Sequence, residues 1–191
     1  NRKRGSTKKG MFHLIASCGS FAASTSAHRD RFFADQEYLR VRARWFTPSV
    51  GAVEVLEEAG IRMIDRRHVV LELGGTSLGI AGAKGFVGGF PDATLPDFGE
   101  PLLREVYAET TAEVKALDSG LAAIAECNHR IALLHYSPTE TTLEGEPRGI
   151  WAFLGSDRLA EPILEHHPDV VLHGHAHVGA FQGGIWGIEN Q

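Results

Sequence analysis

The sequence predicts one α/β domain. Short apolar, β-rich runs are separated by two longer segments in which apolar residues recur every three or four positions. The 191 residues are 43% apolar and 23% charged, so the chain is large enough to bury a core of its own. No apolar run approaches the roughly 18 residues of a membrane-spanning helix. Two distant cysteines exclude a disulfide scaffold and favour a reducing compartment, so we expect a cytoplasmic protein.

The first readable elements are a helix and a hairpin. Residues 53–59 predict a short helix that a glycine ends. The runs 68–73 and 76–81 are rich in β-forming residues and are separated by Gly74 and Gly75. This two-residue spacing is typical of a tight hairpin turn that needs positive φ angles, so we expect two antiparallel strands.

A glycine-rich segment and the longest helix follow. Residues 81–90 contain four glycines and Lys84, which lets the backbone approach a neighbour closely. The residue order of a phosphate-binding loop is missing. Apolar residues spaced three and four apart predict a helix over 101–128 with one stripe facing a core. The stripe consists of Leu102, Val106, Thr110, Val114, Leu117, Leu121 and Ile124.

The last third of the chain alternates short elements. Residues 131–134 predict a buried strand that ends in His135, and 136–149 form a polar loop. Ser156 or Asp157 can cap a helix over 158–166, which Pro168 stops. A second buried strand at 170–172 leads into a histidine-rich turn.

Seven of the ten histidines fall within residues 129–177. Neutral imidazole is the commonest protein ligand for zinc, manganese, iron and cobalt. His135, His175 and His177 follow apolar strands, and ligands bind at the carboxyl ends of strands in α/β domains. We therefore expect these three to form a metal site. The alternative is that His173 and one partner only hydrogen-bond in a polar loop, and we expect His166 and His167 to contact helix carbonyls.

At this point the residues resemble a known family. The segments that carry the resemblance are Gly174-His175-Ala176-His177, Leu133-Leu134-His135-Tyr136-Ser137-Pro138, Gly79-Ile80-Ala81-Gly82-Ala83-Lys84-Gly85-Phe86, Thr142-Leu143-Glu144-Gly145-Glu146-Pro147 and Phe153-Leu154-Gly155-Ser156. Residues 52–180 resemble the calcineurin-like metallophosphoesterases. The resemblance implies an α/β/β/α sandwich with two divalent metals. It also implies that His135 and His175 ligate one metal, that His177 ligates the other, and that the reaction is phosphate-ester hydrolysis.

The first half of that family's pattern is missing from this sequence. The Asp-x-His, Gly-Asp-x-x-Asp and Gly-Asn-His motifs, which carry the bridging carboxylate and the leaving-group acid, do not occur. Without a bridging carboxylate, two divalent ions about 4 Å apart would repel strongly. The chain thus suits one metal (Mn, Fe or Zn) better than two. The fold is expected to be incomplete at its N-terminal half, and the catalytic residues stay unassigned.

Charge divides the chain at about residue 50. Residues 1–50 carry a net charge of +7 and residues 51–191 one of −12. We expect 1–50 to be a basic segment of different origin, most simply a shifted reading frame or a misplaced start, and 51–191 to be the metallophosphoesterase-like domain. The start of the basic segment, residues 1–23, has the outline of a signal peptide. Its apolar run is, however, shorter than the 7 to 15 residues that a signal peptide needs. Arg40, Arg42 and Arg44 alternate along a strand, either as a solvated edge or as a phosphate-binding face.

The sequence therefore predicts a metal-dependent phosphoesterase that acts on a small phosphate ester or a phosphorylated substrate, with no membrane partner. The alternative is a non-catalytic remnant domain with one metal or none. A third hypothesis, less favoured, is a globular domain whose basic arm binds nucleic acid.

Overall fold

The computed structural model describes residues 13–16 and 61–185. They form a mixed α/β domain in which a mixed sheet is packed against helices. Within this part of the chain, no helix is long and apolar enough to cross a membrane. The predicted helix at 53–59 and the three alternating arginines lie outside the described residues.

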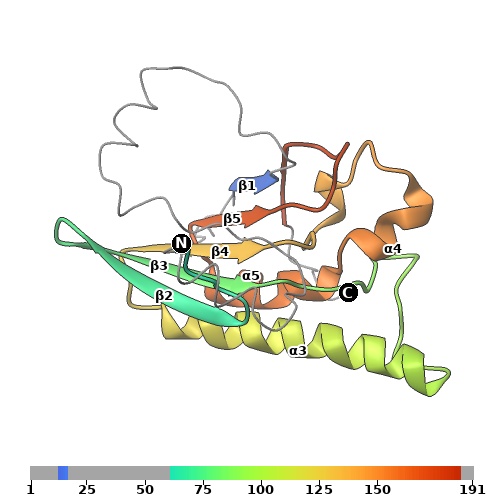
Figure 1. Ribbon diagram of the computed structural model, residues 1–191. Helices are drawn as coiled ribbons and strands as arrows, with labels where there is room; N and C mark the ends of the chain where they lie inside the picture. The colour runs from blue at the N-terminus through green and yellow to red at the C-terminus, as the bar shows by residue number, and fades with distance from the viewer. Residues whose placement is uncertain (1–12, 17–60, 186–191) are drawn as a thin grey trace, which may run out of the picture.

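Four strands build the body of the sheet: β2 (Arg67–Leu73), β3 (Thr76–Ala83), β4 (His129–Leu134) and β5 (Val170–His173). The hairpin prediction is confirmed, because β2 and β3 pair antiparallel and Leu73 faces Thr76 across a turn whose two glycines have φ of 59° and 90°. Strands β3, β4 and β5 are parallel neighbours. Their carboxyl ends therefore lie at one edge of the sheet (Figure 1).

Two short strands extend the sheet beyond β5. β1 (His13–Ala16) pairs parallel with β5, and β6 (Gln182–Gly183) pairs antiparallel with β1. The strand order is β2-β3-β4-β5-β1-β6. Residues 1–50, expected to be a segment of different origin, thus contribute one strand that pairs parallel with β5.

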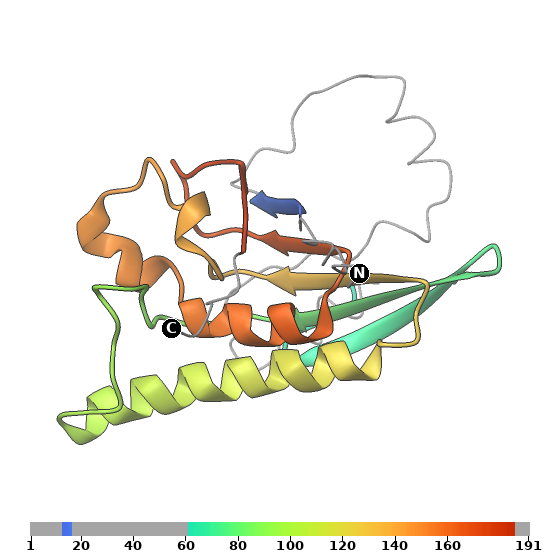
Figure 2. The ribbon, with the colours of Figure 1, turned by 180° about the vertical axis from the view of Figure 1, so that it is seen from behind.

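Helices α3 (Pro101–Ala123) and α5 (Ala160–His166) lie on one face of the sheet (Figures 1 and 2). Small residues let α3 approach β3 closely: a Cβ on Gly79 would lie 2.6 Å from the Ile124 Cβ. The fully buried side chains Leu117, Leu121 and Ile163 fill the space between the helices and the sheet. Burial of such side chains contributes about 1.5 to 3 kcal/mol each.

The helix α3 ends five residues before the predicted end at Asn128. The Asn128 carboxamide oxygen accepts hydrogen bonds from the Ser77 backbone N–H and hydroxyl, both at 2.9 Å. This contact ties the chain to the start of β3, so the backbone leaves the helix and β4 begins at His129. Leu102, predicted in the apolar stripe, is 69% exposed, whereas Glu113 is buried.

The segment between β4 and α5 contains short helices that the sequence did not indicate. These are the 3₁₀ turns η1 (Glu140–Thr142) and η2 (Arg148–Ile150) and the single α-turn α4 (Trp151–Leu154). The predicted cap is confirmed in part: the Ser156 hydroxyl accepts from the Arg158 N–H, but at the start of the 3₁₀ turn η3 (Asp157–Leu159). The helix α5 follows at Ala160 without a side-chain cap. His167, with φ of 51°, ends α5 before Pro168.

Candidate functional site

The candidate site lies where β4 and β5 end. His135 directly follows β4, and His173 is the last residue of β5. Because these strands are parallel neighbours, the residues that follow them are delivered to the same edge of the sheet. The Gly174 N–H donates to the His135 carbonyl at 3.1 Å, which joins the two strand ends through the backbone.

Two of the three predicted ligands lie together. The ring centroids of His135 and His175 are 4.6 Å apart. Tyr136 contacts the His175 ring with a centroid distance of 4.5 Å and lies edge-on to His135 at 5.5 Å. The two imidazoles thus form a small aromatic cluster with Tyr136, although 39 residues lie between them in the chain.

His175 adopts an uncommon backbone conformation. Its φ is 71°, in the left-handed region that side chains other than glycine rarely occupy. Gly174, which precedes it, is not among the described residues with positive φ. The His175 Nε2 contacts the Phe153 carbonyl of α4 at 3.2 Å. Such backbone strain is found at sites where neighbouring structure holds a residue in place for function.

The site keeps its imidazoles neutral. The pKa of His135 is lowered to about 4, first by burial and then by the nearby charges of His175, His173, His177 and Lys84. Burial also lowers the pKa of His175. A metal ion binds the neutral ring, so both side chains are in the ligating form at neutral pH.

His177 lies on the outer side of the site. It is exposed, and the Glu146 carboxylate accepts from its backbone N–H and from the N–H of Val178, the latter at 2.6 Å. A glycine is required beside this clamp, because Gly145 has φ of 109° and a Cβ there would lie 2.4 Å from the Val178 carbonyl. The structure thus places His177 at the rim.

His173 is buried, with 2% exposure. Its Nδ1 contacts the Gly174 carbonyl at 3.1 Å, and its Nε2 has no hydrogen-bond partner among the described residues. Burial lowers the pKa of His173 to about 4. His173 therefore lies at the buried end of β5 and not in a polar loop, and its hydrogen bond is to the adjacent carbonyl.

The three predicted ligands do not form a closed triad. Within residues 13–16 and 61–185, one group of three brings its ligand atoms within 4.8 Å of one another, and it is Asp118, Glu165 and His166 on α3 and α5. The His166 Nε2 already contacts the Asp118 carboxylate at 2.6 Å. This contact corrects the expectation that His166 binds helix carbonyls. Arg130 instead donates to the carbonyls of His166 and His167.

A groove is lined by residues of the segment after β3 and of the segment after β4. Phe90, Asp92, Arg148 and Trp151 are among its lining residues. The Arg148 guanidinium lies 4.0 Å from the centre of the Trp151 ring. Phe90 and Trp151 pack with Ala176, which stands between His175 and His177. Two residues of the groove thus share a buried cluster with the loop that carries the predicted ligands, but none of the three ligands is among the lining residues.

Sequence reasoning missed Glu113, Glu146 and Tyr136. The two glutamates accept hydrogen bonds from backbone N–H groups of distant loops, and no local sequence pattern reveals such bonds. Tyr136 could have been identified from its position next to His135. No protein-family model matches the chain, and no curated protein and no solved structure matches it significantly.

Proposed function

We propose that this chain is a metal-dependent phosphoesterase of the calcineurin-like type, with His135 and His175 as ligands of one divalent metal and His177 at the rim. The observation that carries the proposal is the convergence of two neutral imidazoles from separate strand ends, 4.6 Å apart. The finer fold, an α/β/β/α sandwich incomplete at its N-terminal half, belongs to this proposal. The described strands form one sheet.

The donor set suits zinc, manganese or iron. Imidazole nitrogen is a good ligand for all three, and a divalent ion held there would stabilise the charge that develops on a phosphoryl oxygen. Lys84 lies near enough to His135 to lower its pKa, and its ammonium is half-buried. We assign Lys84 the role of attracting the phosphate anion. The groove, with Arg148 on its wall, provides space for the rest of the ester.

A specific observation favours a second candidate function, a metal-binding domain without turnover. In the part of the chain that the structure describes, no carboxylate joins these histidines in a group of three ligand atoms. The Glu146 carboxylate already accepts hydrogen bonds from the backbone N–H groups of His177 and Val178. Asp30 and Asp35, the acids that could fill the gap, lie outside the described residues. Binding of nucleic acid by the basic segment, residues 1–50, also stays a prediction.

Hydrolysis of a generic phosphomonoester in the presence of Mn²⁺ tests the proposal. We expect weak turnover that a chelator abolishes and Mn²⁺ restores, because loss of acid–base assistance alone costs a factor of about 10² to 10⁴. His135→Ala should remove it, whereas His129→Ala, an exposed histidine at the start of β4, should not. Turnover that survives both the chelator and His135→Ala would contradict the proposal. Metal binding without turnover would favour the second candidate.

A further inference from the structure

The core of the domain contains a buried carboxylate. Glu113 lies on the face of α3 that packs against the sheet and is 1% exposed. A buried carboxylate is costly unless charged and hydrogen-bonded partners compensate it. Its position between apolar helix residues therefore requires a reason other than packing.

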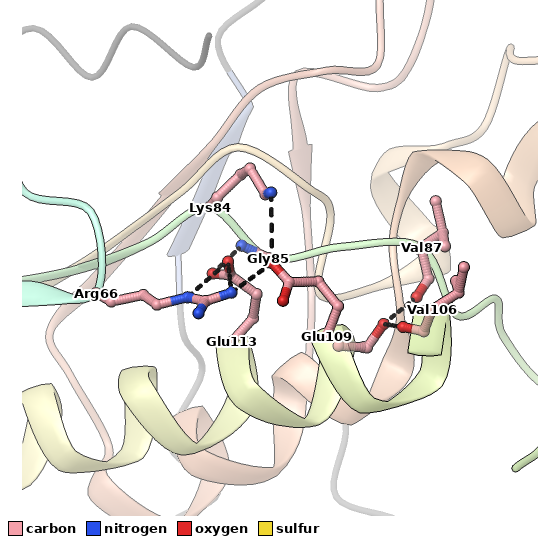
Figure 3. Close-up of polar contacts among 8 residues, drawn as sticks. Arg66, Lys84, Gly85, Val87, Val106, Glu109 and Glu113 are labelled. Carbon is pink, nitrogen blue, oxygen red and sulfur yellow. Dashed lines mark hydrogen bonds and ion pairs between the residues drawn. The ribbon is translucent and has the colours of Figure 1, made fainter. Parts of the chain in front are cut away.

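The two oxygens of Glu113 have different partners. Oε1 accepts from the Arg66 Nε at 3.0 Å and from its Nη2 at 2.8 Å. Oε2 accepts from the Gly85 backbone N–H at 2.9 Å. Figure 3 shows the carboxylate lying between the arginine and the loop that follows β3. Glu113 thus joins a surface cation to the main chain of that loop.

The same peptide group continues to the candidate site. The Gly85 N–H and the Lys84 carbonyl belong to one planar peptide unit. That carbonyl accepts from the N–H groups of His135 at 3.1 Å and Tyr136 at 3.0 Å. The hydrogen bonds therefore run without interruption from Arg66 through Glu113 and one rigid peptide to the backbone of His135. A charged acceptor at one end of such a chain strengthens the bonds at the other.

We propose that Glu113 is a positioning residue of the metal site, holding the backbone of His135 through the Lys84–Gly85 peptide. The inference rests on the proposed function, since it needs His135 to be a ligand. Outer contacts that orient metal ligands typically contribute a factor of 10 to 100 in metal affinity. The loop at Gly85 also packs closely against the residue after His135, because a Cβ on Gly85 would lie 3.0 Å from the Tyr136 Cβ.

The chain offers a matched control. Glu109, one turn earlier on α3, also forms an ion pair with Arg66 but is 40% exposed. Among the described contacts, its carboxylate reaches Arg66 and the Lys84 ammonium and no backbone N–H. Glu109→Gln therefore removes the same charge next to the same arginine, while the Glu113–Gly85 bond stays intact.

Titration of the full chain with Co²⁺, followed by its visible absorption, tests the inference. We expect Glu113→Gln to weaken Co²⁺ affinity at least about 10-fold and to alter the absorption spectrum, and Glu109→Gln to change neither. Leu121→Ala, which destabilises the same face of α3 without touching the loop, should keep the wild-type spectrum. This comparison separates positioning from stability.

Arg66→Gln keeps the test usable if Glu113→Gln does not fold. It should weaken Co²⁺ binding by an intermediate factor, because the half-exposed arginine can be removed more easily. Wild-type affinity and spectrum in the folded variants would overturn the inference and leave the proposed function standing. Absence of Co²⁺ binding by the wild-type chain would overturn both.

Discussion

The two sides of the candidate site hold their histidines by different means. On the inner side, His135 is half-buried, its N–H bonds to the Lys84 carbonyl, and a buried carboxylate supports that peptide from behind. On the outer side, His177 is exposed, and the Glu146 carboxylate binds its backbone from the solvent-facing loop. Both sides use a glutamate on main-chain N–H groups. From the difference in burial we propose that the inner side is the more rigid one and would contribute most to metal affinity, and that the outer side would contribute less.

Removing one histidine from each side should show the largest difference. His135→Ala is expected to weaken Zn²⁺ or Co²⁺ binding at least about 100-fold, because it deletes a ligand from the rigid side. His177→Ala is expected to weaken binding by less than about 10-fold. Competition with a chelator of known affinity measures both. Equal losses of metal affinity in the two variants would show that both sides contribute equally to metal binding, and would contradict the difference proposed between them.

Acid should destabilise the metal-free domain through its buried inner side. Burial lowers the pKa of His173 to about 4, against about 6.5 in an unfolded chain, so the unfolded state binds the proton first. The stabilisation is complete above pH 6.5 and is lost as pH falls toward 4. It amounts to about 3 kcal/mol, and His135 acts in the same direction.

Urea unfolding with chelator present, at pH 7 and at pH 4.5, measures this effect. His173→Gln removes the titrating group, so the fall in stability between the two pH values should be smaller in the variant. An identical fall in both proteins would show that His173 takes up its proton without opposing folding.

The outer clamp should have a smaller effect on stability. Glu146→Gln weakens two charge-assisted hydrogen bonds to backbone N–H groups, and we expect a loss of about 1 kcal/mol after allowance for their exposure. Thermal unfolding measures it. Glu140→Gln, on the same loop and exposed, is the matched control and should leave the melting temperature unchanged. A loss as large as that of Glu113→Gln would contradict the distinction between rim and core.

The smallest effect belongs to the exposed ion pair. Glu109→Gln should change the free energy of unfolding by less than about 0.5 kcal/mol, since exposed pairs contribute little. Denaturant unfolding beside Glu113→Gln measures the contrast between two glutamates that contact the same arginine. Similar losses of unfolding free energy in the two variants would mean that the hydrogen bond from Gly85 to Glu113 does not contribute measurably to stability.

The sequence predicted much of the fold because the relevant signals are local. The glycine pair of the hairpin, the Ser156 cap and Pro168 after α5 each determine backbone geometry within a few residues. The predicted end of α3 was wrong because the path of the chain after the helix depends on a contact between Asn128 and Ser77, which are far apart in the sequence. The α-turn α4 has four residues, too few to show a helical period.

The candidate site was predictable only in part for the same reason. Strand ends indicated where His135 and His175 would meet, but not that His175 would take a positive φ. Glu113 reads as one polar residue beside an apolar stripe, because its partners Arg66 and Gly85 become neighbours only in the folded chain. A pattern along one helix cannot register such partners.

The most direct test of the central claim is a count of metal ions per chain. The purified 191-residue chain, loaded with Zn²⁺ and freed of excess metal, should retain about one ion, as expected for a site with neutral histidines and no bridging carboxylate among the described residues. His135→Ala and His175→Ala should each retain none, and His129→Ala should retain one. Retention of an ion by both His135→Ala and His175→Ala, or absence of metal from the wild-type protein, would contradict the account.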